Sequence, residues 1–241
     1  MRPMLYRAGF WLMLPLSAVQ GLRLRRNALR LPGAAGARKG CSGNGDPLHL
    51  LAVGDSIIDG VGAVRIEDAL PVQFARALSE QMSRCVHWQV EGQTGFDIDD
   101  VIERLEFINI PTPPDIILLS VGVNDVTGVS TTRHWRKRLT GLLDSLSSRW
   151  PGARIIFAGL PPMSLFPLPP QPLRFTLGLR AATMDRIAAE IIAGYPDAIH
   201  VPTQINPSDH SFCEDGFHPS PESCNLWARE LASMEMRRNP T

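Results

Sequence analysis

From residue 48 onward, short apolar runs alternate with longer segments of helical periodicity, and this alternation constrains the fold more than any other feature. The apolar runs are residues 48–53, 86–90, 116–121, 154–158 and 199–201, and the helical segments are residues 69–82, 98–107, 132–149 and 177–192. Strands and helices in regular alternation indicate a parallel sheet with helices on both faces. A chain of 241 residues fits one hydrophobic core, which can grow to about 250 residues. We therefore predict one α/β domain.

The beginning of the chain differs from the rest in charge. Residues 1–40 hold eight basic residues and no acidic one, so the remainder carries 24 − 8 = 16 basic against 24 acidic residues, a formal charge of −8. Residues 31–47 are rich in Gly, Ala and Pro, which is typical of a linker. We expect an appendage over residues 1–47 and the folded domain over residues 48–241. An acidic domain argues against a nucleic-acid groove, which needs clustered Lys and Arg.

The appendage contains an apolar run, residues 8–22, with arginines on both sides. Fifteen helical residues at about 1.5 Å each span roughly 22 Å, short of the ~30 Å hydrocarbon core of a bilayer. More arginines follow the run than precede it, which favours a segment at a membrane surface, with residues 8–30 near anionic headgroups. An export signal, with a periplasmic or exported location, and a helix packed onto the domain stay open as alternatives. The 22 arginines against 2 lysines favour a bacterial origin.

Four short motifs carry residues suited to chemistry. They are Gly54-Asp55-Ser56, Gly92-Gln93-Thr94-Gly95, Gly122-Val123-Asn124-Asp125 and Asp215-Gly216-Phe217-His218. The first three follow predicted strands, at the edge where parallel sheets bind ligands. Gly54 allows a tight turn, so the hydroxyl of Ser56 can stand at this edge. Asp215 lies close enough to His218 to accept its Nδ1 proton while Nε2 faces a serine.

A hydrolytic site also needs hydrogen-bond donors for the charge that forms on the former carbonyl oxygen. The side-chain amide of Asn124 and the backbone N–H groups of Gly95 and Ser56 are the candidates. Each motif alone has a simpler explanation: a turn at Gly95, a helix N-cap at Asn124, or a surface loop around His218. Only the set of four predicts a complete site for acyl transfer.

In this order the motifs resemble the SGNH branch of the GDSL esterases and lipases, over about residues 48–235. Two departures are small: Ile57 replaces the leucine of the family name, and Thr94 replaces a serine before the glycine. The resemblance implies a flavodoxin-like, three-layer α/β/α fold with a mostly parallel five-stranded sheet. It implies ester hydrolysis through an acyl-enzyme, without metal or organic cofactor. The implied roles are Ser56, Asp215 and His218 as the catalytic triad, and Ser56, Gly95 and Asn124 as the oxyanion hole.

The substrate is less constrained by the sequence. The Pro-rich stretch 161–170 carries Met163, Leu165 and Phe166, which are candidates for an acyl pocket; a loop packed onto the sheet edge is the alternative. With the amphiphilic appendage, this stretch favours lipophilic or lysophospholipid-like esters. The alternatives are an O-acetyl esterase acting on a sugar or cell-envelope polymer, an acyltransferase, and a non-catalytic SGNH-like binding module. The oligomeric state is left open.

The remaining polar and thiol groups favour structural roles. The four cysteines are too sparse for a disulfide scaffold and contain no CxxC pair, so small buried thiols are expected. A bridge between Cys213 and Cys224, which flank His218, requires an exported protein. The acidic residues at 97, 99 and 100 suit the start of a helix, and residues 134–138 suit a solvated basic face. No metal site is predicted.

Overall fold

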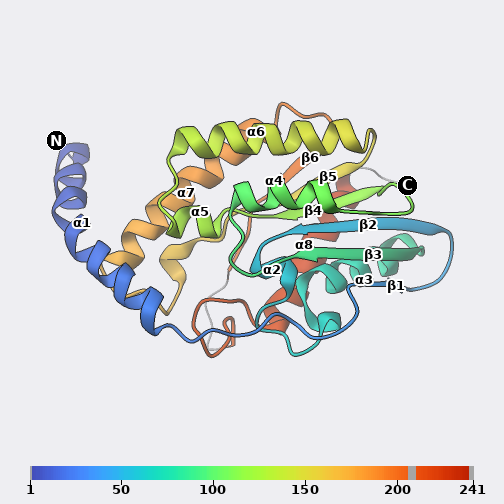
Figure 1. The fold of residues 1–241 in the computed structure, drawn as a ribbon, viewed down its shortest axis with the longest axis horizontal. Helices are drawn as coiled ribbons and strands as arrows, with labels where there is room; N and C mark the ends of the chain where they lie inside the picture. The colour runs from blue at the N-terminus through green and yellow to red at the C-terminus, as the bar shows by residue number, and fades with distance from the viewer. Residues whose placement is uncertain (1, 206–209, 239–241) are drawn as a thin grey trace.

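The computed structural model is a three-layer α/β/α domain built around a six-stranded sheet (Figure 1). It describes residues 2–205 and 210–238, with side chains described for residues 15–205 and 210–237. The strands are β1 (Lys39–Ser42), β2 (Pro47–Gly54), β3 (Cys85–Gly92), β4 (Ile116–Ser120), β5 (Arg154–Ala158) and β6 (Ala198–Val201). Their order in the sheet is β1-β3-β2-β4-β5-β6. The five strands β2 to β6 are parallel and run in the flavodoxin-like order, which confirms the predicted architecture.

The sixth strand corrects the prediction of a plain linker over residues 31–47. β1 pairs antiparallel with β3 along the edge of the sheet, with Cys41 opposite His87. Ala34 is buried and Ala35 forms a bridge with Arg65. Lys-Gly-Cys-Ser has little intrinsic preference for a strand, so only the exposed edge of β3 explains the pairing. The sheet thus begins at Lys39, ahead of the predicted start at residue 48.

The four predicted helices are confirmed, and others join them. The predicted ones are α3 (Leu70–Met82), α4 (Ile98–Phe107), α6 (Thr132–Arg149) and α7 (Leu173–Ile192). The sequence analysis did not identify the helices α2 (Ser56–Asp59), α5 (Val123–Thr127) and α8 (Pro221–Arg238) or the 3-10 turns η1 (Ile66–Asp68) and η2 (Met163–Leu165). α4 begins where predicted because Asp97 and Asp100 form a capping box around its first turn.

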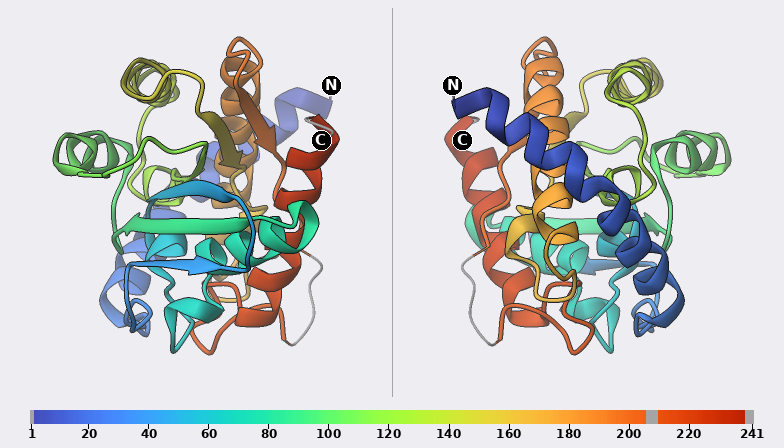
Figure 2. Two further views of the ribbon diagram at one scale, coloured as in Figure 1. Left: turned by 90° about the vertical axis from the view of Figure 1, so that its right-hand side faces the viewer. Right: turned by 90° about the vertical axis from the view of Figure 1, so that its left-hand side faces the viewer.

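Two hydrophobic layers enclose the sheet. α3 and α8 pack on one face, and α4, α6 and α7 pack on the other, as the end-on views of Figure 2 also show. Every residue of the central strand β4 is buried. Strands that are buried on both faces have continuous apolar sequences, so their positions could be predicted well.

The N-terminal helix α1 (Arg2–Asn27) lies against α7 (Figure 2, right). The Gln20 side chain donates to the carbonyl of Gln171 at 2.8 Å and accepts the N–H of Leu173 at 3.1 Å. Arg25 donates to the carbonyl of Thr127 at 2.8 Å. The second half of the predicted apolar run therefore packs onto the domain. The side chains of its first half, residues 8–14, lie outside the described ones, and no helix in the described part is long and apolar enough to cross a bilayer.

Candidate active site

Ser56 stands where β2 ends and α2 begins. A side chain at Gly54 would overlap the carbonyl oxygen of Ser120 on the neighbouring strand β4. Only glycine therefore allows the chain to turn from β2 into α2 at this position. The Asp55 carboxylate caps α2 by accepting the Ile57 N–H at 3.1 Å. Ser56 is 8% exposed, and its hydroxyl is at the carboxyl edge of the sheet, as the sequence predicted.

His218 and Asp215 reach Ser56 from a loop that is far away in sequence. His218 Nε2 lies 3.1 Å from Ser56 Oγ, and His218 Nδ1 lies 2.6 Å from Asp215 Oδ2. The other Asp215 oxygen accepts the backbone N–H groups of Phe217 and His218 at 2.9 and 3.0 Å. The three predicted triad residues therefore form one hydrogen-bonded chain.

The protonation of Asp215 suits this chain. Burial alone would raise the pKa of its carboxyl, but the hydrogen bonds from the His218 ring and backbone and from Phe217 outweigh burial and lower the pKa. An ionised Asp215 accepts the Nδ1 proton and leaves the Nε2 lone pair for the hydroxyl of Ser56. This arrangement can deprotonate a serine hydroxyl during attack on a carbonyl carbon.

Apolar packing supports the turn that carries Asp215 and His218. Phe166, from the Pro-rich stretch, meets the rings of Phe212 and Phe217 edge-on at 5.1 Å each. The Leu168 N–H donates to the carbonyl of Gly216 at 3.1 Å. The Pro-rich stretch thus packs onto the turn that carries Asp215 and His218, a contact that the sequence analysis did not predict.

The other two motifs bring donors to the same edge. Gly95 has a left-handed backbone with φ of 92°, which favours glycine. The Asn124 amide donates to the carbonyl of Phe96 at 2.8 Å, so one of its two N–H bonds is used to hold the loop that carries Gly95. Asn124 is partly exposed, and Gly95 is exposed.

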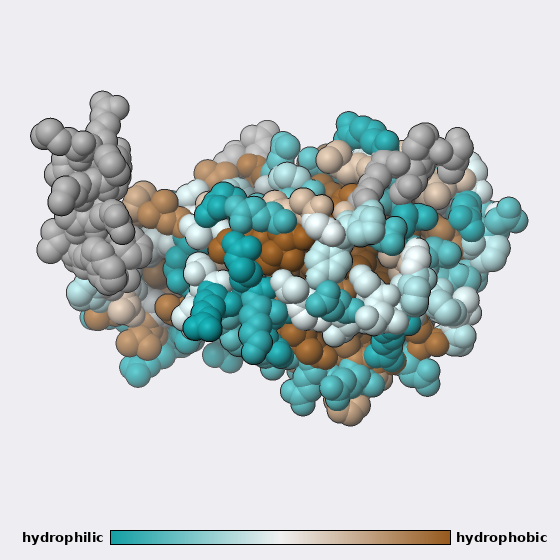
Figure 3. Space-filling model, turned by 90° about the horizontal axis from the view of Figure 1, so that it is seen from above, coloured by the Kyte–Doolittle hydropathy of each residue, from teal (hydrophilic) through white to brown (hydrophobic). Residues whose placement is uncertain are grey.

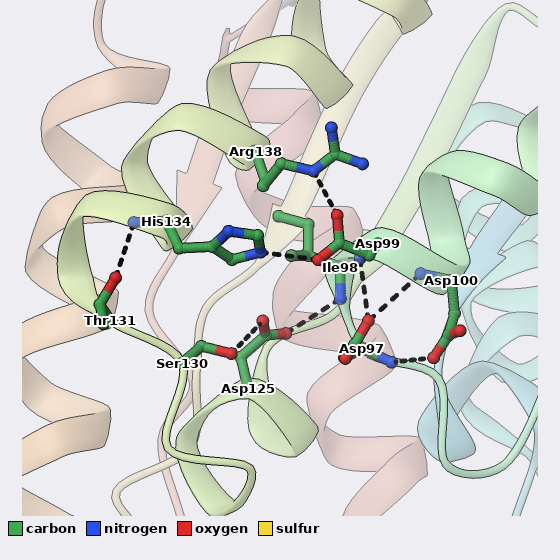
Figure 4. Close-up of polar contacts among 9 residues, drawn as sticks. All are labelled: Asp97, Ile98, Asp99, Asp100, Asp125, Ser130, Thr131, His134 and Arg138. Atoms are coloured by element: carbon green, nitrogen blue, oxygen red, sulfur yellow. Dashed lines mark hydrogen bonds and ion pairs between the residues drawn. The ribbon is translucent and has the colours of Figure 1, made fainter.

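The residue after Asn124 is a buried carboxylate, Asp125 (Figure 4). Asp125 is 1% exposed, and its oxygens accept the Ile98 N–H and the Ser130 hydroxyl, each at 3.0 Å. Burial raises the pKa of the Asp125 carboxyl to about 6, although these hydrogen bonds oppose the shift. Burial likewise raises the pKa of Asp55 to about 7. Neither carboxylate belongs to the predicted triad.

The acidic start of α4 also has structural partners (Figure 4). Asp99 lies 2.6 Å from His134 Nε2 and pairs with Arg138 as well, both on α6. The predicted solvated basic face is therefore partly engaged in joining α6 to α4. Within the described residues, no group of three or more His, Cys, Asp or Glu is placed to hold a metal ion. All four cysteines are free thiols, Cys213 and Cys224 included.

A cavity of about 370 Å³ opens beside Ser56 and His218. Its lining is mainly apolar and comes from the ends of β4 and β5, from the segment after β6 and from one side of α8; it includes Val121, Val123, Leu160, Phe166, Ile205, Phe212, Leu226 and Trp227. Of the three predicted pocket residues, only Phe166 lines it. Met163 is fully buried in the core, and Leu165 is exposed outside the cavity, so both assignments are corrected.

The sequence analysis missed the α8 side of the cavity. Buried residues recur along α8 at Cys224, Trp227, Ala228, Leu231 and Ala232, which is helical spacing. That signal was present in the sequence, but nothing in it pointed toward Ser56. The neighbours of a cavity depend on how α8 packs beside β5.

The chain is similar to known proteins in both sequence and fold. The model of the GDSL-like Lipase/Acylhydrolase family matches residues 52–223. A GDSL-like esterase of Mycobacterium tuberculosis (strain ATCC 25618 / H37Rv) is 27% identical over 197 residues, which are 79% of this chain and 62% of that protein. This chain thus matches less than two thirds of the length of that relative.

Solved structures share the fold. A lipase from a goat rumen metagenome has a TM-score of 0.65 at 17% identity, over 77% of this chain and 96% of that one. A family two carbohydrate esterase from Clostridium thermocellum, in complex with cellohexaose, has a TM-score of 0.64 at 14% identity, over 79% and 64%. An acetylxylan esterase from Geobacillus stearothermophilus has a TM-score of 0.56 at 20% identity, over 83% and 96%. At such identities these similarities concern the fold alone.

Proposed function

Because the chain belongs to the GDSL-like lipase/acylhydrolase family, we propose that it is a serine esterase that hydrolyses lipophilic carboxylic esters through an acyl-enzyme. The observation that carries the proposal is the hydrogen-bonded chain from Ser56 through His218 to Asp215 at the mouth of an apolar cavity. A nucleophile, a base and an orienting carboxylate in sequence are what acyl transfer to serine requires.

In the proposed mechanism, Ser56 Oγ attacks the ester carbonyl carbon while His218 Nε2 takes its proton. The carbonyl oxygen becomes negative and accepts hydrogen bonds from the N–H groups of Ser56 and Gly95 and from the Asn124 amide. His218 then protonates the leaving alcohol, and the acyl group stays on Ser56. Water, deprotonated by His218 in the same way, releases the acid. Asp215 stays ionised and holds the ring throughout.

The size of the cavity favours acyl chains of short to medium length. Its volume of about 370 Å³ is at the lower end of ligand pockets, which hold roughly 300–1,000 Å³. Val121, Val123 and Leu160 offer apolar contacts to an acyl chain that enters beside Ser56. A lysophospholipid-like substrate would place its headgroup outside.

The test is hydrolysis of p-nitrophenyl esters from acetyl to palmitoyl by the wild type, Ser56→Ala and His218→Ala. We expect kcat/KM to peak between about four and eight carbons and to fall by at least about 10³-fold in both variants. The exposed His87→Ala serves as a matched control, with activity unchanged. A Ser56→Ala variant as active as the wild type would refute the role of Ser56 as nucleophile. A folded wild type that cleaves no ester would refute the proposal as a whole and favour a binding module.

A second candidate is an O-acetyl esterase acting on a sugar or cell-envelope polymer. Its support is that two solved structures of similar fold are described as a carbohydrate esterase and an acetylxylan esterase. The same ester series separates the two: activity confined to acetyl, together with release of acetate from acetylated xylan, would favour this candidate.

For the N-terminal segment we propose contact with a membrane surface, in a bacterial protein that is membrane-associated. Leu16, Val19 and Leu22 are 53%, 47% and 59% exposed on α1. Arg23 and Arg26 are exposed near them, and apolar and cationic side chains together suit an anionic lipid surface. A periplasmic or exported enzyme is the alternative, and fractionation of the native cells distinguishes the two.

A further inference from the structure

We propose that two carboxylates outside the triad, Asp59 and Asp125, position the Gly95 N–H for the oxyanion from the two sides of its loop, and that Arg38 of the N-terminal segment fixes Asp59. The inference rests on the proposed function, because it assigns these residues a role in stabilising an oxyanion. All three are positioning residues, since none needs to touch the substrate.

Phe96 packs against the core, but the three residues before it in the loop, Gly95 included, have no such packing. Gln93, Thr94 and Gly95 are all exposed. A Cβ built at Gly95 would meet no atom within 4 Å. The backbone contributes two bonds, from Gln93 N–H to Gly54 at 3.2 Å and from Phe96 N–H to Gln93 at 3.3 Å. An oxyanion donor must be held within a fraction of an ångström, so we expect polar side chains to help hold the exposed residues of this loop.

Asp59 holds the loop on the Thr94 side. Its Oδ2 accepts the Thr94 N–H at 3.1 Å and the Thr94 hydroxyl at 2.5 Å, and Oδ1 pairs with Arg38 at 2.8 Å. Arg38 also donates to the Asp59 carbonyl at 3.0 Å and to the Ala34 carbonyl at 3.2 Å. Asp59 ends α2, the helix that begins with Ser56. One side chain therefore ties the nucleophile's helix to the residue next to Gly95.

Asp125 holds the loop on the other side. It accepts the Ile98 N–H at the start of α4 (Figure 4). Its neighbour Asn124 donates to Phe96 in the same loop. Ser130 fixes the second oxygen of Asp125. Two consecutive residues of α5 therefore join the Asn124 donor to the Gly95 donor, so the distance between the two donors depends on Asp125.

Neutral substitutions separate positioning from charge. A nearby negative charge disfavours an oxyanion, so if charge were the main effect, replacing either Asp by Asn would raise kcat. If the carboxylates act by positioning, the same substitutions lower kcat, because an asparagine amide has one acceptor oxygen and cannot replace both carboxylate oxygens. At position 59 the ion pair with Arg38 is lost as well. The sign of the change therefore tests the inference.

The experiment compares Asp59→Asn, Thr94→Val, Arg38→Met, Asp125→Asn and Asp125→Ala with the wild type on p-nitrophenyl butyrate. Loss of a whole oxyanion donor costs about 10²–10³ in kcat, so we expect losses of about 10-fold from a misplaced one, with KM within about twofold. Arg38→Lys should recover most of the loss of Arg38→Met. Glu67→Gln is the matched control, because its exposed pair with Arg65 lies near α2 and touches neither carboxylate.

A second readout separates positioning from general damage. An alkyl boronic acid forms a tetrahedral adduct on Ser56 whose oxygen mimics the oxyanion, whereas the product butyrate does not. We expect the boronate Ki to rise about 10-fold in the same variants, with the butyrate Ki unchanged. Thr94→Val, on an exposed loop, keeps the test decisive even if Asp125→Ala does not fold.

The outcomes also separate this inference from the proposed function. Unchanged or raised kcat in Asp59→Asn and Asp125→Asn, with Ser56→Ala inactive, would overturn the positioning roles and leave the esterase intact. A wild type that neither cleaves the ester nor binds the boronate would overturn both.

Discussion

Among single residues, Asp215 has the sharpest role, because its two oxygens serve different purposes. One holds His218 Nδ1, and the other accepts two backbone N–H groups of its own turn. An asparagine in its place would keep the turn but present an N–H or a weaker acceptor to Nδ1. We expect Asp215→Asn to lower kcat by about 10³–10⁴ with little change in KM.

Steady-state kinetics on p-nitrophenyl butyrate check this expectation. The adjacent Glu214 is exposed, so Glu214→Gln is the matched control and should keep full activity. A loss of less than tenfold in Asp215→Asn would mean that His218 is oriented by other contacts.

Asp55 predicts a pH dependence of stability. Burial raises its pKa from 3.8 to about 7 in the folded protein, so the folded state binds this proton more tightly than the unfolded chain. The buried charge therefore lowers stability above pH 7, and this cost disappears as the pH falls toward 4. Asp55→Asn removes the charge and keeps an acceptor for Ile57. We expect it to raise the free energy of unfolding by about 1–2 kcal/mol at pH 8, with the gain vanishing near pH 4.

Urea unfolding of both proteins between pH 4 and 8 measures this gain. The matched control is Asp46→Asn at an exposed site, for which the difference from wild type should be small at every pH. A gain for Asp55→Asn that does not depend on pH would contradict the charge explanation.

Residues within one motif could be predicted, and residues joined only by the fold could not. Ser56, Asp215 and His218 were named because each stands in a short pattern, and the structure places them in contact. Asp59, by contrast, meets Thr94 across 35 positions of sequence. Met163 was misplaced for the opposite reason: an apolar side chain in a Pro-rich stretch looks the same whether it enters the core or a cavity.

At the scale of elements, the Pro-rich stretch supports the turn that carries His218. Phe166 is 3% exposed and packs against Phe212 and Phe217, while its neighbour Leu165 is 39% exposed. We expect Phe166→Ala to destabilise the protein by about 3–5 kcal/mol, because it leaves a large cavity. Phe166→Leu should cost about 1–1.5 kcal/mol and still lower kcat, because the turn loses its aromatic contacts.

Urea unfolding and ester hydrolysis of the same samples provide the measurement. Leu165→Ala is the adjacent control and should change stability by less than about 0.5 kcal/mol. If Phe166→Leu kept full activity, the packing would serve stability alone.

Some helices and strands could be predicted from the sequence more accurately than others. α4 and α6 were predicted to the residue, because capping side chains at Asp97 and Thr131 mark their starts. β1 was missed because its pairing depends on the open edge of β3 and on backbone bonds that any four residues can make.

At the scale of the whole molecule, the opposite charges of the N-terminal segment and the domain suggest an orientation on a lipid surface. α1 presents Leu16, Val19 and Leu22 together with Arg23 and Arg26 on its exposed side, while its other side packs on α7. Anionic lipids would attract α1 and repel the acidic domain. Each arginine near such a surface contributes about 1 kcal/mol.

We therefore expect Arg23→Glu with Arg26→Glu to weaken binding to phosphatidylglycerol vesicles by at least about 30-fold, because two attractive charges, together about 2 kcal/mol, become repulsive. The matched control is Arg133→Glu with Lys137→Glu on α6, whose side of the molecule carries hydrophilic side chains among apolar patches in Figure 3. It changes the net charge equally but leaves α1 intact, so its vesicle binding should fall much less. Both double variants should cleave soluble p-nitrophenyl butyrate like the wild type, because neither site lies at Ser56. Equal weakening by the two pairs would mean that net charge, and not α1, governs binding.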